Sequence, residues 1–178
     1  MTSPKQDASL RDGQPFITVI VAVYNNVDTL QQCIDSVTAQ TYPNIELIVI
    51  DGASSDGTRD VLERASHSIA YWVSEPDRGL YHAWNKGLEQ SNGDWVFFLG
   101  ADDYLYHANV LAEAAMQLKG VPQDTSVAYG QIMLIGDNDQ EMFKFGEPWD
   151  AIKKRFRHTM CIPHAAAMHR KDAFSRYG

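Results

Sequence analysis

Cysteines are few in this sequence, and long apolar runs are missing from it. The two cysteines, Cys33 and Cys161, form no spaced pair, so neither a disulfide framework nor a zinc site is indicated. No stretch approaches the roughly 18 apolar residues of a membrane span, and the polar start of the chain, MTSPKQDASLRDGQP, has no hydrophobic signal region. We therefore expect a cytoplasmic protein whose residues 1–14 are disordered.

Positive charge is scarce overall, but it gathers at one end of the chain. The net charge of −8 argues against a general nucleic-acid surface. Residues 151–178 nevertheless hold seven Lys or Arg and one acid, a net charge of +6, so the first 150 residues carry −14. This basic segment could contact phosphates, or anionic lipid headgroups at the inner face of a membrane, or it could be an ordinary solvated helix face.

A phosphate-binding signature is also missing. The Gly- and Ser-rich loop DGASSDGT, residues 51–58, has no Lys and no G-x-G-x-x-G order, which disfavours a P-loop and a dinucleotide-binding fold. Its Ser54, Ser55, Asp56 and Thr58 are instead expected to cap the helix that follows. Asp51 differs because it closes a buried strand, where its carboxylate can accept from a base N–H or a ribose hydroxyl.

The sequence does contain a regular alternation of strand and helix patterns. Apolar, β-branched runs predict buried parallel strands at residues 16–23, 45–50, 69–74 and 95–99, and weaker patterns predict strands at 126–135 and 141–145. Apolar residues at helical spacing predict helices around residues 30–37, 58–65, 80–88 and 109–119. Together these patterns predict an α/β fold with a Rossmann-like, mainly parallel sheet covered by helices on both faces.

Acidic and polar residues follow the ends of the predicted strands. In chain order they are Tyr24, Asn25, Asp51, Glu75, Asp77, Asp102 and Asp103. Because the carboxyl ends of parallel strands meet at one edge of a sheet, we expect these side chains to line one crevice. Adjacent carboxylates such as Asp102 and Asp103 repel each other unless a cation lies beside them, and Mg²⁺ or Mn²⁺ suits such oxygen ligands. The alternative for this pair is a solvated turn.

Three segments together carry a family resemblance: TVIVAVYN, TLQQCIDSVTAQTYPNIELIVIDGASSDGT and SEPDRGLYHAWNKGLEQSNGDWVFFLGADD. They resemble the nucleotide-diphospho-sugar transferases of glycosyltransferase family 2, which have the GT-A fold. The resemblance is strong over residues 16–104 and weaker beyond them, and it predicts a GT-A domain over residues 15–178.

The resemblance also implies roles for individual residues. Tyr24 and Asp51 would hold the nucleotide base. Asp102 would contact the ribose or the metal, and Asp103 would coordinate the Mg²⁺ or Mn²⁺ that bridges the diphosphate. Many relatives place an acid or Asn where this chain has Gly100, which puts a three-carboxylate metal site in doubt.

The segment EPDRGLYHAWNKG, residues 75–87, lies between two predicted strands. Asp77 and Arg78 are expected to line the donor pocket beside Asn25, and Arg78 to pair with phosphate. In the same segment, Lys86 is expected to face solvent and Asn85 to tie the neighbouring loop down.

A late histidine, His164, follows Pro163 at the edge of a further predicted strand. Histidines at such late positions in GT-A enzymes sometimes reach the metal or the diphosphate. His164 is therefore a candidate metal ligand, with a structural or acceptor-side role as the alternative.

The implied function is inverting transfer of a sugar from a nucleotide-diphosphate donor, for example a UDP-sugar, to a glycan or lipid-linked glycan in bacterial surface-polysaccharide synthesis. One alternative is a non-catalytic nucleotide-sugar-binding domain or inactive fragment. A nucleotidyltransferase is disfavoured, because VYNNVDT, residues 23–29, is not the Gly-rich basic loop that such an enzyme needs.

An inverting transfer also needs a general base at the acceptor hydroxyl, and no residue above is free for that role. In proteins that this chain resembles, the base is an acid found beyond a segment like RYG, residues 176–178. The base is therefore expected beyond Gly178, in a chain that is truncated here. The alternative is a short enzyme that uses Glu147, Asp150 or His164.

Overall fold

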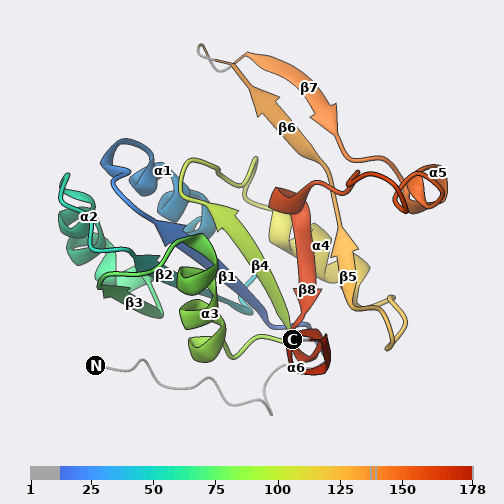
Figure 1. The fold of residues 1–178 in the computed structure, drawn as a ribbon, viewed down its shortest axis with the longest axis horizontal. Helices are drawn as coiled ribbons and strands as arrows, with labels where there is room; N and C mark the ends of the chain where they lie inside the picture. Colours follow the sequence, from blue (N-terminus) through green and yellow to red (C-terminus); the bar gives the residue numbers. More distant parts are fainter. Residues whose placement is uncertain (1–12, 137, 139, 178) are drawn as a thin grey trace.

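A six-stranded sheet and a separate two-stranded hairpin form the framework of the computed structural model, which describes residues 13–136, 138 and 140–177 (Figure 1). The sheet contains β1 (Ile17–Val23), β2 (Ile45–Asp51), β3 (Tyr71–Ser74), β4 (Trp95–Gly100), β5 (Val127–Tyr129) and β8 (Ala167–Arg170), in the order β3-β2-β1-β4-β8-β5, and the hairpin contains β6 (Ile132–Ile135) and β7 (Glu141–Phe145). Most of the segment 1–14, expected to be disordered, lies outside the described residues.

The helices alternate with the strands in the first two thirds of the chain. They are α1 (Val27–Thr38), α2 (Thr58–Ala65), α3 (Leu80–Gln90), α4 (Val110–Leu118), α5 (Trp149–Ile152) and α6 (Lys171–Tyr177), with short 3-10 turns η2 (Ser66–Ser68) and η3 (His164–Ala166). No helix within the described ranges is long and apolar enough to cross a membrane.

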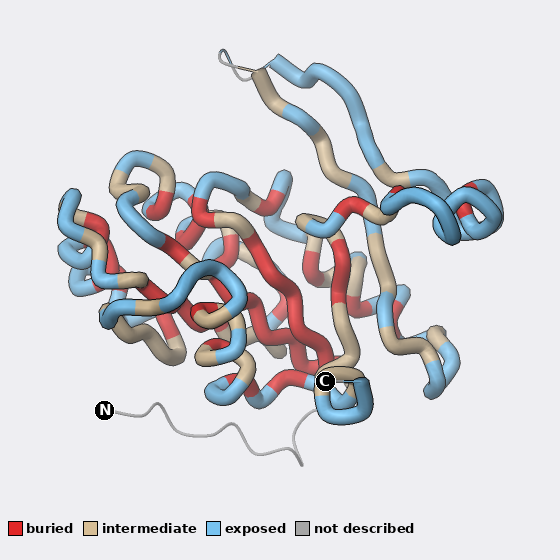
Figure 2. Tube along the Cα trace, viewed as in Figure 1, coloured by how far each residue is buried: buried red, intermediate tan, exposed pale blue. Residues whose placement is uncertain are grey.

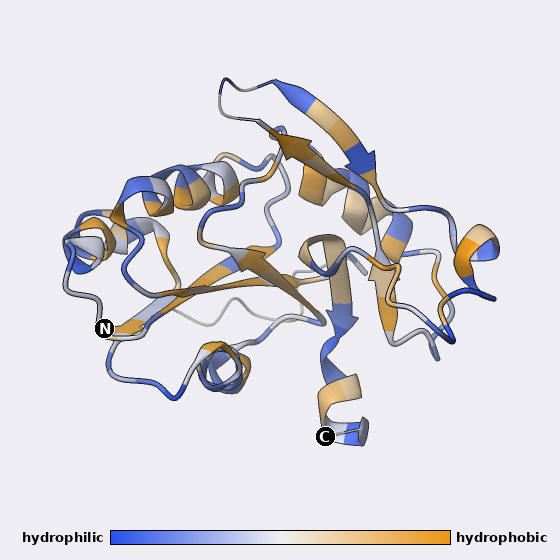
Figure 3. Cartoon of the chain, turned by 45° about the horizontal axis from the view of Figure 1, so that its top comes forward, coloured by the Kyte–Doolittle hydropathy of each residue, from blue (hydrophilic) through white to orange (hydrophobic). Residues whose placement is uncertain are grey.

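The central strands are parallel and buried, as their continuous apolar runs predict. β1 pairs in parallel with β2 and with β4, and β2 pairs in parallel with β3. Because side chains alternate along a strand, Ile17 and Val19 pack with α1, α2 and α4 on one face, while Ile20 and Phe98 pack with α3 on the other. Figure 2 shows these strands as the buried centre of the molecule, and Figure 3 shows their hydrophobic composition. The predicted α/β class is confirmed.

The predicted single strand at residues 126–135 is wrong. It divides at Gly130 into β5, which joins the main sheet, and β6, which leaves it to pair with β7. A close crossing of two backbones accompanies the division: a β-carbon placed on Gly146 would lie 2.7 Å from the carbonyl oxygen of Gly130. The late strand β8 then inserts antiparallel between β4 and β5.

Candidate functional site

The carboxyl ends of β1, β2 and β4 lie at the same edge of the sheet. Val23 is aligned with Asp51 of β2, and Ala22 is aligned with Gly100 of β4. Since neighbouring strands are about 4.8 Å apart, the ends of β2 and β4 are separated by roughly 10 Å, with β1 between them. The residues that follow these strands therefore surround one crevice.

The Asp51 carboxylate is wholly buried, and protein groups already bind both of its oxygens. The backbone N–H of Ser54 donates to both oxygens at 3.2 Å, and the Ser54 hydroxyl donates to Oδ1. The Ser74 hydroxyl donates to Oδ2 at 2.5 Å. A carboxylate has about four acceptor sites, so Asp51 holds the ends of β2 and β3 together with the loop after β2. A nucleoside would have to share or replace one of these donors.

The loop after β2 also binds the loop after β1. The backbone N–H of Asn25 donates to the Ser54 hydroxyl at 2.7 Å, and the Asn25 side-chain oxygen accepts from Ser55 N–H at 2.9 Å. The Asp56 carboxylate accepts from the N–H groups of Val27 and Thr58, the first residues of α1 and α2, at 3.0 Å each. We expected this loop to cap only the helix that follows it, whereas Asp56 caps two helices.

Tyr24 and Asp77 approach each other over Gly52. A β-carbon placed on Gly52 would lie 2.9 Å from Oδ2 of Asp77 and 3.2 Å from Cδ2 of Tyr24. The Tyr24 ring is 67% exposed, so it offers a flat face at the edge of the crevice. Three of the predicted donor-binding residues, Tyr24, Asp51 and Asp77, thus lie close to Gly52 in space.

The guanidinium of Arg78 is exposed and has no hydrogen bond or ion pair with any described residue. The loop before it is fixed by Lys86, whose ammonium group binds Glu75 at 2.9 Å and the carbonyl oxygen of Pro76 at 3.2 Å. The expectation that Lys86 faces solvent is wrong, since only 18% of its side chain is exposed. Asn85, expected to tie this loop down, is exposed, and its side chain makes no hydrogen bond with another described residue.

The carboxylates of Asp102 and Asp103 turn back and meet over Gly100. A β-carbon placed on Gly100 would lie 2.7 Å from Oδ2 of Asp103 and 2.9 Å from Oδ1 of Asp102. The turn beneath them is fixed from α1, where the Thr29 hydroxyl donates to the carbonyl oxygen of Ala101 at 2.8 Å and the Cys33 thiol donates to that of Gly100 at 3.4 Å. The absence of a side chain at Gly100 allows this convergence.

Electrostatic repulsion within the pair is not relieved by a protein cation. Neither Asp102 nor Asp103 has an ion pair with a Lys, Arg or His in the described ranges. Partial burial, followed by the charge of Asp102, raises the pKa of Asp103 above its usual value, although a hydrogen bond from the backbone lowers it in part. Two converging, charged oxygen donors suit a hard divalent cation such as Mg²⁺ or Mn²⁺, so these residues fit the metal that the sequence predicts.

His164 does not join this pair in a three-residue cluster. Among residues 13–136, 138 and 140–177, no group of three or more His, Cys, Asp or Glu side chains could hold a metal ion. The His164 ring lies instead against Trp84 of α3, with ring centroids 5.1 Å apart, and is stacked 6.4 Å from Phe98. The geometry therefore supports the structural alternative for this histidine.

A groove of about 950 Å³ begins at the two carboxylates. It extends between α4 and the strands β5 and β6, and most of its wall is apolar or aromatic. Representative lining residues are Asp102, Tyr104, Tyr106, Val110, Ile132 and Met133. The groove thus joins charged groups at the crevice to an apolar channel along the hairpin.

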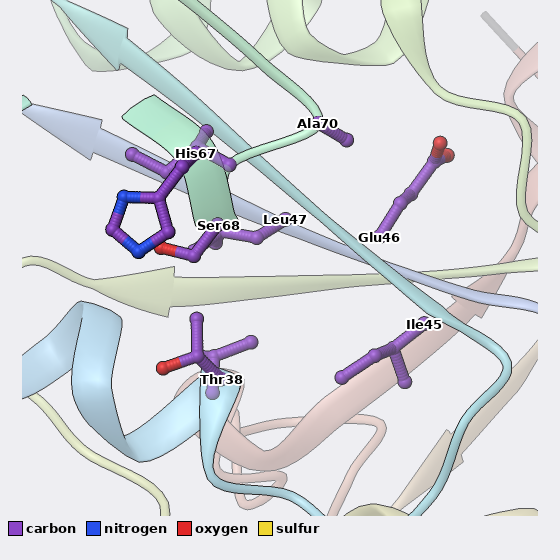
Figure 4. Close-up of a pocket in the computed structure, with 9 residues that line it drawn as sticks. Thr38, Ile45, Glu46, Leu47, His67, Ser68 and Ala70 are labelled. Carbon is purple, nitrogen blue, oxygen red and sulfur yellow. The ribbon is translucent and has the colours of Figure 1, made fainter. Parts of the chain in front are cut away.

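A smaller pocket of about 340 Å³ lies at the other end of the sheet. Figure 4 shows it beside the start of β2, with Thr38, Glu46 and His67 among its lining residues. Ile45, the first residue of β2, lines this pocket, whereas Asp51 closes the same strand at its carboxyl end. The pocket is therefore separate from the crevice.

Solved structures with the same arrangement identify the fold. Mannosyltransferase PcManGT from Pyrobaculum calidifontis, solved in complex with GDP-Man and Mn²⁺, superposes with a TM-score of 0.69 at 22% identity, over 93% of this chain and 47% of that one. TarS of S. aureus, residues 1–349, superposes with a TM-score of 0.67 at 22% identity, over 90% and 48% of the two chains. The mainly parallel sheet and its helices form a GT-A fold.

Sequence comparison then identifies the family. The model of glycosyl transferase family 2 matches residues 18–178, so the chain belongs to that family. A PGL/p-HBAD biosynthesis glycosyltransferase of Mycobacterium tuberculosis is 30% identical over 167 residues, and an uncharacterised glycosyltransferase of the same organism is 33% identical over 167 residues. Each alignment covers 92% of this chain and 62% of the relative, so the chain spans less than two thirds of their length.

Four residues important for the geometry of the site were not predicted from the sequence. Gly52 and Gly100 leave the space in which the site side chains converge, and Thr29 and Cys33 fix the turn after β4 from α1. Gly52 directly follows β2 and Gly100 ends β4. These positions at strand ends could have indicated that both glycines belong to the site. The contacts of Thr29 and Cys33 join distant segments, and no local pattern announced them.

Proposed function

We propose that this protein transfers a sugar, with inversion, from a nucleotide-diphosphate donor to an acceptor hydroxyl in the synthesis of a bacterial surface polysaccharide. The observation that carries the proposal is the presence of two converging groups at one sheet edge. One group is Tyr24 with Asp77 over Gly52, and the other is Asp102 with Asp103 over Gly100. Their separation of roughly 10 Å, estimated from strand spacing, suits a nucleoside at one group and a diphosphate at the other.

On the donor side, Tyr24 and Asp51 would bind the nucleoside. Arg78, whose guanidinium has no partner among the described residues, would pair with a phosphate oxygen, because a guanidinium matches phosphate geometry. Asp77 would help to shape the pocket, and Asn25 would hold its wall through its bonds to the loop after β2. Related folds were solved with GDP-Man and with UDP-GlcNAc, which supports a nucleotide-sugar donor, with UDP-sugars among the candidates.

Asp102 and Asp103 would hold the Mg²⁺ or Mn²⁺. When bound, the ion neutralises the negative charge that grows on the departing diphosphate. In the absence of the ion these carboxylates would repel that diphosphate. His164 is proposed as a ligand only if its ring leaves Trp84, since the structure shows it packed there.

The groove that begins at the carboxylates is the proposed acceptor site. Its aromatic and apolar wall suits a glycan carried on an apolar group better than a free, fully polar sugar, because burying apolar surface is favourable. A lipid-linked glycan fits this description. The PGL/p-HBAD biosynthesis glycosyltransferase supports glycosyl transfer to an acceptor as an activity of the family.

The catalytic base is not assigned to a described residue. Glu147 is ion-paired with Arg155, and a hydrogen bond from Lys153 lowers the pKa of Asp150. The lowered pKa makes Asp150 a weaker base, and the Glu147 carboxylate is already occupied by its ion pair. The prediction that an acid after Gly178 supplies the base stays a prediction.

A thermal-shift screen of GDP- and UDP-sugars, with and without Mn²⁺, tests the proposal. A ligand at 100 times its Kd stabilises the native state by about 2.7 kcal/mol, so we expect a rise in Tm that requires Mn²⁺. Asp103→Asn should lose the rise, and the control Asp124→Asn, an exposed acid away from the crevice, should keep it.

A sugar-transfer assay separates this proposal from the non-catalytic alternative. A Mn²⁺-dependent shift without donor hydrolysis or transfer, with acceptor present, would favour a nucleotide-sugar-binding module. No shift with any nucleotide sugar would contradict both functions.

A further inference from the structure

Exposed apolar side chains are concentrated in one segment, residues 142–160, which we call the docking segment. Of the fourteen large apolar or aromatic side chains that are exposed among the described residues, six belong to it: Met142, Phe143, Phe145, Trp149, Phe156 and Met160. Their exposed fractions run from 36% for Phe156 to 76% for Met160. Figure 2 shows β7 and the region around α5 as almost continuously exposed, away from the buried sheet.

Positive charge accompanies these apolar groups. The docking segment holds five Lys or Arg and two acids, a net charge of +3, whereas the whole chain carries −8. Both acids are neutralised within the segment, because Glu147 binds Arg155 and Asp150 binds Lys153. The cations that remain are Lys144, Lys154 and Arg157, which are exposed and have no ion pair with any described residue.

The basic residues nearer the end of the chain are already used by the fold. Arg170 lies over the Trp95 ring, 4.6 Å from its centroid, and donates to the carbonyl oxygen of Thr125. Lys171 donates to the carbonyl oxygen of Ser91, and Arg176 pairs with Asp172. The sequence assigned membrane contact to residues 151–178 as a whole, but the structure leaves free cations only in the first part of that range.

The pattern of the side chains points to a lipid surface rather than to a protein. Aromatic residues, Met and Arg are common at protein–protein interfaces, but Lys, of which the segment holds three, is depleted at their centres. Aromatic and Met side chains interleaved with Lys and Arg are instead typical of segments that lie in the headgroup region of a bilayer. There the stems of Lys and Arg cover apolar surface while their charged ends reach anionic phosphates.

We propose that the docking segment binds the surface of an anionic lipid bilayer. Phe143, Phe145 and Trp149 enter the headgroup boundary, and Lys154 and Arg157 pair with lipid phosphates, whereas Lys144, on the other face of β7, lines the groove beside α4. Figure 3 shows that β6, the partner of β7, is also strongly hydrophobic. Its Leu134, paired with Phe143, is exposed, and its other residues are partly buried. The proposal does not depend on sugar transfer and is tested without it.

Vesicle co-sedimentation of the 178-residue chain provides the test. Vesicles of phosphatidylcholine alone are compared with vesicles in which roughly one lipid in four is phosphatidylglycerol. We expect binding to the anionic vesicles, weakened by added salt because exposed charges are screened. Equal binding to both vesicle types, or no binding to either, would overturn the proposal.

Matched variants localise the binding. The double variant Lys154→Glu with Arg157→Glu should weaken partition of the protein onto anionic vesicles at least about 20-fold. Each Lys or Arg near an anionic surface contributes about 1 kcal/mol of binding free energy. Arg64→Glu with Lys119→Glu makes the same change in net charge on α2 and after α4, so it should weaken partition far less. Equal losses from the two double variants would show general electrostatic attraction and reject the docking segment.

The apolar contribution is tested in the same way. Phe143→Ser with Phe145→Ser should weaken partition about tenfold, whereas Tyr177→Ser, which removes an aromatic ring that is 76% exposed outside the segment, should not. Circular dichroism checks that each variant is folded. If the Phe variant instead abolishes a dimer seen by light scattering and leaves vesicle binding unchanged, the surface is a self-association interface and the proposal fails.

Trp149 reports insertion directly. Among the four Trp residues it alone is exposed, so brominated lipids in the vesicles should quench its fluorescence. Trp149→Phe should remove the quenching and keep the binding. Quenching that persists in Trp149→Phe would place the lipid contact elsewhere on the molecule.

Discussion

Two regions of this molecule contain large apolar side chains and place them in opposite environments. β1 buries six of its seven residues between two layers of helices, whereas every residue of β7 is exposed. In the donor region of β1, β2 and β4, the chain supplies its own partners on both faces of the sheet. In the docking segment it does not, and unpaired cations accompany the apolar groups. Apolar composition therefore indicates that a side chain gains from being buried. The fold decides whether it is buried inside the protein or left for another surface to cover.

The largest effect is expected at the acidic pair Asp102 and Asp103, the proposed metal site. Asp103→Asn should weaken Mn²⁺-dependent binding of nucleotide sugar by at least about 100-fold, because it removes the charge of a proposed metal ligand, and should leave the docking segment unaffected. Isothermal titration with and without Mn²⁺ measures this change. Unchanged Mn²⁺-dependent affinity would contradict the assignment.

The same variant gives a pH prediction for the metal-free protein. The pKa of Asp103 is raised in the folded state, so its contribution to stability is present below its unfolded pKa of 3.8 and is lost as the pH rises through the folded pKa. Urea unfolding should show this loss in the wild type and not in Asp103→Asn.

A pair of glycine variants compares the rigidity of the two regions. The β-carbon of Gly93→Ala would lie 2.7 Å from the Thr18 backbone nitrogen and 2.9 Å from the Phe16 carbonyl oxygen. This backbone sits at the start of the central strands and cannot move aside, so we expect the free energy of unfolding to fall by about 3 kcal/mol. Denaturant unfolding provides the measurement.

Gly146→Ala is the counterpart near the hairpin. Gly146 has a φ of +121°, and its added β-carbon would lie 2.7 Å from the carbonyl oxygen of Gly130. Because β7 buries no residue, we expect faster hydrogen exchange in β6 and β7 with little loss of global stability. Equal losses of global stability in the two variants would contradict the comparison.

Asp51→Asn should disturb both the fold and the nucleoside site. The amide retains one acceptor oxygen but places an N–H₂ donor beside Ser54 or Ser74, so a cost of about 1–3 kcal/mol is expected. We expect that cost in the free energy of unfolding, together with weaker nucleoside monophosphate binding and an unchanged metal requirement. If Asp51→Asn kept the stability and the nucleoside monophosphate affinity of the wild type, the proposed roles of Asp51 in the fold and in nucleoside binding would be wrong.

Gly100→Ala and Gly52→Ala should separate the two converging groups by function. The neighbours of each added β-carbon are ends of side chains, which can move aside without disturbing the backbone. Gly100→Ala should weaken metal-dependent binding about tenfold by displacing carboxylates, and Gly52→Ala should weaken nucleoside monophosphate binding without changing the metal requirement. Identical binding profiles for the two variants would contradict the separation.

The smallest effect concerns Cys33, beneath the acidic pair. Burial, followed by the charges of Asp103 and Asp102, raises the pKa of its thiol from 9.0 to about 12. The resulting stabilisation is fully present below pH 9 and is lost as the pH rises through about 12. The wild type should therefore lose stability relative to Cys33→Ala in that range. A constant difference between them would indicate an ordinary thiol.

Much of the donor region was determined by the sequence itself. The continuous runs at β1, β2 and β4 predicted buried parallel strands, because only strands covered on both faces are apolar at every position. The parallel arrangement then placed Asp51 and Asp102 at one edge, since the carboxyl ends of such strands coincide. These inferences used only local periodicity and the order of the elements.

Tertiary structure alone decided the details that depend on distant segments meeting. The split of residues 126–135 depends on a backbone crossing with Gly146, and the burial of Lys86 depends on where Glu75 lies. The position of His164 against Trp84 is likewise a contact between separate elements. Local patterns record the preferences of neighbouring residues, whereas close approaches such as the convergence of Asp102 and Asp103 over Gly100 are set by the packing of the whole chain.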